Sequence, residues 1–270
     1  MCCHQAPPTA ASRAAVRTQA KSKCITESIV SQNLLGLKSE SRLEEFFYSL
    51  RSRGLLAVCV QETWRPGLET LKNGGCLLFT AGLKKADMKS NRGEQGVGIA
   101  LSEKGVPAWK EAGSVLHNDF GGRVIEVRLQ PREEKGRPVV LFLVSVYSPV
   151  GNSHPERWEE FLIQLDACIA RKVKGDVLVI GIDSNSSVGT MGRDDQQSMT
   201  AVGPHGCAHL NLAGERFRTY LEVSGLTAAT TYFKKKAYGT WIHPARKSLI
   251  KLTIFSQRRV ISVDSQMLVA

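Results

Sequence analysis

The chain has 270 residues, 42% of them hydrophobic, so it can bury the core of one large globular domain. Its 36 Lys and Arg residues exceed its 25 Asp and Glu residues, and the resulting formal charge of +11 favours a polyanionic partner such as nucleic acid. No apolar run approaches the ~20 residues of a membrane helix, and seven scattered cysteines without metal-ligand spacing exclude a disulfide framework and a structural zinc site.

The N-terminal segment has the composition of a tail. Residues 1–23 contain no acidic residue and four basic ones among Ala, Ser and Thr, as in disordered tails and organellar transit peptides. We predict a disordered basic tail over residues 1–24 and one domain over residues 25–270, because no linker or repeat divides the remainder. The unpaired cysteines indicate a reducing, intracellular location, nuclear or cytoplasmic, and an organellar address in the tail stays open.

Residues 27–63 predict a strand, a helix and a second strand. The helix, over residues 39–54, has apolar residues at helical spacing and Ser41 as a possible N-cap. The strand that follows, over residues 55–63, is an almost continuous apolar run of the kind that is buried on both faces of a sheet.

The middle of the chain predicts short strands separated by glycine-marked turns. These strands cover residues 75–83, 96–102, 123–130 and 139–149. A helix follows over residues 154–173, with Pro155 near its start, acidic residues early and basic residues late, which complements the helix dipole. Residues 176–183 then form an apolar strand.

The last third predicts a loop, a helix and further strands. Residues 190–212 are polar and Gly-rich, and residues 213–225 read as a helix that ends at Gly225. Strand-like runs follow at residues 226–233, 239–243 and 248–257. Helices interleaved with mostly antiparallel strands predict a four-layered α/β sandwich, in which two packed mixed sheets are flanked by helices.

Five polar side chains stand at the carboxyl ends of apolar runs. They are Asn33, Glu62, Tyr147, Asp183 and Asn185. Strands fix such positions while the rim of the sheet stays open to solvent, so sites are often assembled there. Each residue alone also has a structural explanation: a turn amide, a cap, a half-buried strand tyrosine, or an Asx turn for the last two.

The order of these residues is more informative than any one of them. The succession N…QET…VYSP…IDSN, with GVGIALS, RVIEVRL, ERFRTYLEVSGL, TYFKKK and TWIHP at their places, resembles the endonuclease/exonuclease/phosphatase superfamily. The likeness is closest to the branch of LINE-type retrotransposon endonucleases and craniofacial development protein 2-like proteins, and it runs from about residue 25 to residue 260. It implies a DNase-I-like fold and metal-dependent cleavage of DNA phosphodiesters.

The resemblance implies a metal-binding side of the site. Glu62 matches the glutamate that binds the essential cation, Mg²⁺ or Mn²⁺. Asn33 matches the family's early substrate-side asparagine, and we expect it to be a catalytic residue and a second ligand of the cation. Tyr147 matches the tyrosine near the scissile phosphate. A hard cation held by one or two carboxylates neutralises the phosphate oxygens and polarises the phosphorus, which the reaction requires.

The resemblance also implies a proton-transfer and phosphate-binding side. Asp183 would handle the proton of the attacking water or of the leaving group, and Asn185 would hold a phosphate oxygen. Ile182 replaces a glycine that the family usually has. In the basic C-terminal region, Lys234 and Lys235 are expected to contact the substrate.

The end of the chain departs from the family pattern. The position of the family's late aspartate is occupied by Thr253, and no terminal histidine follows, so we expect a truncated or degenerate C-terminus that lacks the last strand. We expect His205, His209 and His243 to be loop residues that do not replace it.

Three functions therefore remain open. The first is an active DNA endonuclease. The second is a decayed copy, which either binds nucleic acid without cutting it or has no function. The third is a hydrolase of a smaller phosphoester such as an inositol phosphate. The fold alone does not choose among substrates.

Overall fold

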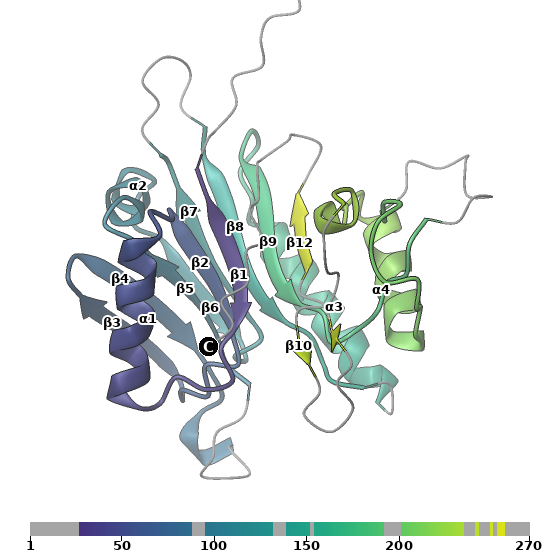
Figure 1. Ribbon diagram of the computed structural model, residues 1–270, viewed down its shortest axis with the longest axis horizontal. Helices are drawn as coiled ribbons and strands as arrows, with labels where there is room; N and C mark the ends of the chain where they lie inside the picture. The colour runs from purple at the N-terminus through teal and green to yellow at the C-terminus, as the bar shows by residue number, and fades with distance from the viewer. Residues whose placement is uncertain are drawn as a thin grey trace, which may run out of the picture.

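The computed structural model describes residues 27–87, 95–131, 139–151, 154–191, 201–234, 241–242, 249–250 and 253–256. Two five-stranded sheets pack face to face, and helices cover their outer faces (Figure 1). The strand orders are β1-β2-β5-β4-β3 and β12-β9-β8-β7-β6. The predicted α/β sandwich of two mixed sheets flanked by helices is confirmed, while the predicted tail over residues 1–24 lies outside the described residues.

The elements have the following bounds. The strands are β1 (Ile29–Asn33), β2 (Ala57–Gln61), β3 (Leu68–Asn73), β4 (Cys76–Ala81), β5 (Val97–Leu101), β6 (Leu116–Phe120), β7 (Val124–Leu129), β8 (Leu141–Tyr147), β9 (Val177–Asp183), β10 (Trp241–Ile242), β11 (Leu249–Ile250) and β12 (Thr253–Ser256). The helices are α1 (Glu40–Ser52), α2 (Gly105–Glu111), α3 (Pro155–Ile169) and α4 (Leu212–Val223), with 3-10 turns η2 (Lys85–Asp87) and η3 (Ala229–Thr231).

Each sheet contains one parallel pair, and these two pairs position the site. Strand β1 runs parallel to β2, with Asn33 opposite Gln61, and β8 runs parallel to β9, with Tyr147 opposite Asp183. Parallel strands end at the same edge of a sheet, so four of the polar strand ends lie on the rims of the two sheets.

The two sheets approach each other closely at Gly181 of β9. A side chain there would contact Cys59 of β2, with Sγ only 2.8 Å from the added carbon, and Ser31 Oγ at 3.0 Å. The missing side chain therefore lets β9 lie directly against β1 and β2. Apolar residues of both sheets fill the remaining space, and Ala108 of α2 is buried in the same core.

The outer faces are covered by amphipathic helices. Helix α1 buries Leu43, Phe47 and Leu50 against the first sheet. On the second sheet, α3 and α4 pack together through Trp158 and Phe217, whose ring centroids are 6.2 Å apart. Within the described residues, no helix is long and apolar enough to cross a membrane.

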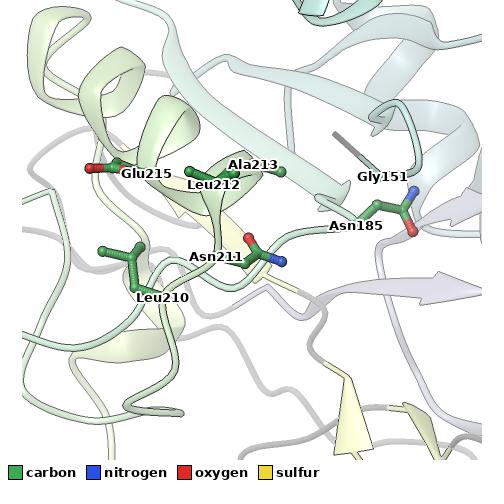
Figure 2. A pocket seen from close by; sticks show the side chains of 7 residues that line it. All are labelled: Gly151, Asn185, Leu210, Asn211, Leu212, Ala213 and Glu215. Carbon is green, nitrogen blue, oxygen red and sulfur yellow. The ribbon is translucent and has the colours of Figure 1, made fainter. Parts of the chain in front are cut away.

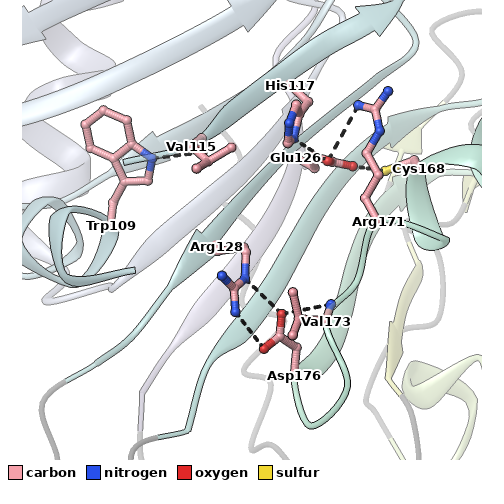
Figure 3. Close-up of polar contacts among 9 residues, drawn as sticks. All are labelled: Trp109, Val115, His117, Glu126, Arg128, Cys168, Arg171, Val173 and Asp176. Carbon is pink, nitrogen blue, oxygen red and sulfur yellow. Dashed lines mark hydrogen bonds and ion pairs between the residues drawn. The ribbon is translucent and has the colours of Figure 1, made fainter. Parts of the chain in front are cut away.

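Polar contacts attach α3 and the segment after it to the outer face of the second sheet (Figure 3). Glu126 of β7, 1% exposed, accepts a hydrogen bond from Cys168 Sγ at 2.5 Å, lies 2.7 Å from His117 Nδ1 and forms an ion pair with Arg171 at 3.7 Å. Arg128 also makes two bonds to the carboxylate of Asp176, at 2.9 and 3.0 Å.

Two local predictions were wrong. The N-cap of α1 is Ser39, not Ser41, because Ser39 is extended and its hydroxyl accepts the Arg42 N–H at 3.4 Å. Residues 226–233 contain η3 instead of a strand. The Thr231 hydroxyl donates to Ala228 O at 2.6 Å, which closes a local turn, and it accepts the Gly203 N–H, also at 2.6 Å, which joins this turn to the loop before α4.

Candidate active site

The carboxyl ends of β1, β2, β8 and β9 bring four of the predicted residues together. Asn33 and Glu62 come from the first sheet, and Tyr147 and Asp183 come from the second. Asn185 follows in the turn after β9, and its backbone N–H donates to Asp183 Oδ1 at 3.1 Å. Residues up to 150 positions apart in the chain thus share one site.

Asn33 bridges the two carboxylates. Its Nδ2 donates to Glu62 Oε1 and to Asp183 Oδ2, each at 2.8 Å, so these oxygens lie no more than twice that distance apart. Its Oδ1 accepts the N–H of Leu35 at 3.0 Å, which fixes the orientation of the amide. The amide nitrogen, not the oxygen, therefore faces the carboxylates, and Asn33 holds them in place in this arrangement.

Asp183 is 7% exposed, and its burial is the main factor that raises the pKa of its carboxyl group. The hydrogen bonds from Asn33 and from the backbone of Asn185 lower that pKa, while the charge of Glu62 raises it. An aspartate with a raised pKa takes up a proton at higher pH than an exposed one, which suits a group that transfers protons.

Tyr147 stands beside both carboxylates. Its hydroxyl donates to Glu62 Oε1 at 3.1 Å. Burial raises the pKa of the phenol most, the charges of Glu62 and Asp183 raise it further, and Asn185 lowers it, so Tyr147 remains a neutral donor at pH 7. Arg123 supports the backbone of this residue, because its Nη1 donates a hydrogen bond to the Tyr147 carbonyl at 3.2 Å.

Two site residues have left-handed backbone conformations that are rare outside glycine. The φ angles are +52° at Glu62 and +42° at Asn185. Glu62 O accepts from Gly36 N at 2.8 Å, and Asn185 Nδ2 donates to Ser148 O at 3.0 Å. Strained residues that neighbouring contacts hold in place cluster at functional sites.

Gln61 and Ser148 support the site, although no sequence pattern predicted a role for them. Gln61 is fully buried between the sheets, and its Nε2 donates to Ser31, Ser145 and Gly181 O at 3.1 to 3.2 Å. Ser148 donates to Asp183 O from both its backbone N–H, at 3.0 Å, and its hydroxyl, at 3.1 Å. The only signal in the sequence was the position of the Gln61 amide at the end of an apolar run.

The donor set fits a hard cation with open coordination positions. Glu62 and Asp183 supply two neighbouring carboxylates, and Glu62 is partly exposed. In the part of the chain that the structure describes, no group of three or more His, Cys, Asp or Glu side chains could enclose a metal. Mg²⁺ often binds to one or two carboxylates and fills its remaining positions with water and phosphate oxygens.

A pocket of about 470 Å³ adjoins the site at Asn185. Its wall is formed by Asn185, by Gly151 after β8, by Leu210 and Asn211 just before α4, and by Leu212, Ala213 and Glu215 in the first turn of α4 (Figure 2). Asn211 lies between α4 and the turn that carries Asn185 (Figure 2).

The remaining predicted residues are not part of this cluster. Lys234 is exposed just after η3, and Lys235 and His243 lie outside the described residues. His209 is exposed and His205 half-buried in the loop before α4. The backbone of Thr253 in β12 pairs with Ile182, next to Asp183 along the strand.

A scan against protein-family models and a search of curated proteins find no match to the sequence. Similar folds occur among solved structures. The AP endonuclease LMAP from Leishmania major is 12% identical over 85% of this chain and 78% of that one, with a TM-score of 0.55. The 3′ phosphatase NExo from Neisseria, bound to a product DNA hairpin, is 15% identical over 85% and 86%, with a TM-score of 0.55.

An endonuclease/exonuclease/phosphatase family protein from Leptotrichia buccalis is 12% identical over 86% of this chain and 88% of that one, with a TM-score of 0.50. These likenesses agree with the sheet order and with the helices on both outer faces: all of them indicate the same fold. The chain shares the fold of these structures, a DNase-I-like sandwich of two mixed sheets.

Proposed function

We propose that the chain is a Mg²⁺- or Mn²⁺-dependent phosphodiester hydrolase of the retrotransposon endonuclease type that acts on DNA. The observation that carries this proposal is the bridge from one amide, Asn33 Nδ2, to the carboxylates of Glu62 and Asp183. Two carboxylates of different exposure, held side by side, can divide metal binding and proton transfer between them.

Each residue of the site has a chemical role in this proposal. Glu62, the more exposed carboxylate, would hold the cation with help from Asp183, and the bound cation would neutralise the phosphate oxygens. Asp183, with its raised pKa, would take the proton of the attacking water or return one to the leaving group. The amide of Asn185 and the hydroxyl of Tyr147 would bind non-bridging oxygens.

Charge and structural neighbours favour nucleic acid as the substrate. The net charge of +11 attracts a polyanion. Among proteins of the same fold, LMAP is an AP endonuclease and NExo is bound to a DNA hairpin. The pocket beside Asn185 also leaves space next to the proposed phosphate position.

A second candidate is a protein that binds nucleic acid without cleaving it. It is favoured by Thr253, which stands where the resembling family has an aspartate and whose strand pairs with β9 beside Asp183. A missing electrostatic group of this kind lowers a rate by about 10²- to 10³-fold. The two candidates therefore differ in cleavage and agree in binding.

Nicking of a supercoiled plasmid in Mg²⁺ tests the proposal. We expect wild-type protein to nick the plasmid, chelation with EDTA to stop the reaction, and Glu62→Gln or Asp183→Asn to slow it by about 10²- to 10³-fold. Asp176→Asn is the matched control, because Asp176 is 8% exposed against 7% for Asp183 and lies at the opposite end of β9.

The control should retain its activity per folded molecule. Plasmid binding without nicking, at any Mg²⁺ or Mn²⁺ concentration, would reject catalysis in favour of the second candidate. Neither binding nor nicking would reject both.

A further inference from the structure

The turn that carries Asp183 and Asn185 is tied to the start of α4 by one side chain. Asn211 Oδ1 accepts the Ser187 N–H at 3.2 Å and the Gly214 N–H at 2.7 Å. The second bond is an ordinary N-cap contact at the start of a helix. The first reaches outside the helix, to a residue two positions after Asn185.

The backbone strengthens the same attachment. The N–H of Asn211 donates to Ser187 O at 3.2 Å, so Asn211 and Ser187 bond in both directions. Val188 and Leu210 form an antiparallel bridge next to this pair. A side chain at Gly214 would collide with Ser187 O, which shows how closely α4 approaches the turn.

The turn requires support from outside because Asn185 has a φ of +42°. Its own contacts join it to the preceding segments: its N–H donates to Asp183 Oδ1 at 3.1 Å and its Nδ2 to Ser148 O at 3.0 Å. After Asn185 in the chain, the next backbone N–H that donates to a side chain is that of Ser187, and its acceptor is Asn211.

We propose that Asn211 is a positioning residue, which fixes the Asp183–Asn185 turn through Ser187 and thereby sets where the Asn185 amide meets the substrate. The kinetic part of this inference rests on the proposed function, whereas the structural part does not. A residue that only caps α4 would stabilise the helix without affecting the turn.

Hydrogen exchange of the peptide over residues 184–189 separates these roles. In Asn211→Ala, the amides of this peptide should exchange about 10-fold faster, as expected when one partly buried hydrogen bond is lost. Asn211→Asp keeps an oxygen that can accept both N–H groups, so exchange should return close to the wild-type rate.

Ser102→Ala is the matched control. Ser102 is 5% exposed, and its hydroxyl accepts the N–H groups of Lys104 and Gly105, each at 3.2 Å, at the start of α2. It follows β5, whose end pairs with the beginning of β2, so it lies at the rim opposite the site. Both alanine variants should lower Tm by about 2–4 °C, but only Asn211→Ala should speed exchange over residues 184–189.

Plasmid nicking adds the kinetic test. Asn211→Ala should lower kcat by about 10- to 100-fold with little change in KM, because a displaced catalytic group affects the reaction more than binding. Ser102→Ala should retain its kcat, and Asn211→Asp should recover most of it. Unchanged exchange over residues 184–189 in Asn211→Ala would overturn the inference, whether or not the wild type nicks DNA.

If exchange increases as expected and the wild type does not nick DNA, the proposed function fails while Asn211 keeps its role in fixing the turn. Faster exchange in Asn211→Ala together with a kcat equal to that of an active wild type would reject the link between this turn and catalysis.

Discussion

Asp183 and Glu62 share a single amide donor, and this arrangement explains how two carboxylates can stand together in a largely buried place. Unpaired buried charge is costly, so a carboxylate with few donors tends to keep a proton. Asn33 supplies one donor to each acid. Asp183, the more deeply buried of the two, has its pKa raised by that burial.

The raised pKa of Asp183 predicts a gain in stability when the carboxylate is removed. The folded state binds the Asp183 proton more tightly than the unfolded state, so ionisation of Asp183 destabilises the fold as pH rises from about 3.9, its unfolded value, through its folded pKa. Asp183→Asn should therefore raise the free energy of unfolding at pH 7 by ~1 kcal/mol. This gain should shrink as pH falls toward 4.

Urea denaturation at pH 7 and pH 4 measures this difference. Asp176→Asn serves as the control of opposite sign, because it removes the negative charge and one of the two oxygens that accept hydrogen bonds from Arg128, and it should lower the free energy of unfolding by ~1–3 kcal/mol. A less stable Asp183→Asn protein at pH 7 would show that the carboxylate contributes net stabilising contacts to the fold.

The sequence predicted which residues stand at the strand ends but could not show how they are supported. Asn33, Glu62, Tyr147 and Asp183 follow apolar runs, and that pattern is local. Gln61 is different, because its partners Ser145 and Gly181 lie 84 and 120 positions away. No periodicity along the chain indicates such contacts.

At the scale of elements, the contact of β9 with β2 sets the distance between the two halves of the site. Gly181→Ala would place a methyl group against Cys59 and Ser31. We expect it to lower the free energy of unfolding by ~1–3 kcal/mol, the usual cost of overpacking a filled core. Thermal or chemical denaturation would show it.

The swap Cys59→Gly/Gly181→Ala is the control for this contact. It moves the side-chain carbon from one strand to the other, so the double variant should be more stable than the sum of the two single losses predicts. Strict additivity would contradict close contact between these strands.

Sequence patterns predicted the buried elements better than the edge ones. Strands β2, β8 and β9 are buried along their whole length, and their apolar runs identified them. Strand β3 was not predicted, because it is an edge strand of sequence LETLKN whose side chains alternate between exposed and half-buried. Residues 226–233 looked like a strand because threonines favour strands, but the Thr231 hydroxyl donates to Ala228 O, three residues back, in a 3-10 turn.

At the scale of the whole molecule, the charge of +11 predicts salt-dependent binding to DNA. The affinity for a short duplex, measured by fluorescence anisotropy in Ca²⁺ without Mg²⁺ between 50 and 200 mM NaCl, should fall steeply. Lys234→Ala should reduce the slope of log affinity against log salt by about one unit if this exposed lysine binds a phosphate.

Lys72→Ala is the control for Lys234. Lys72 is also exposed but lies on β3, the edge strand of the first sheet farthest from β1. Its removal should leave the slope unchanged. An unchanged slope in Lys234→Ala would place Lys234 outside the binding surface, and a flat salt response of the wild type would reject phosphate contacts altogether.

A double-mutant cycle on the nicking rate tests most directly whether Glu62 and Asp183 serve one reaction. When two groups act as a unit, removing one already abolishes the contribution of the other. The double variant Glu62→Gln/Asp183→Asn should therefore nick no more slowly than the slower of the two single variants. If the two losses multiply, or if either single variant is as active as Asp176→Asn, the two carboxylates do not form one catalytic site.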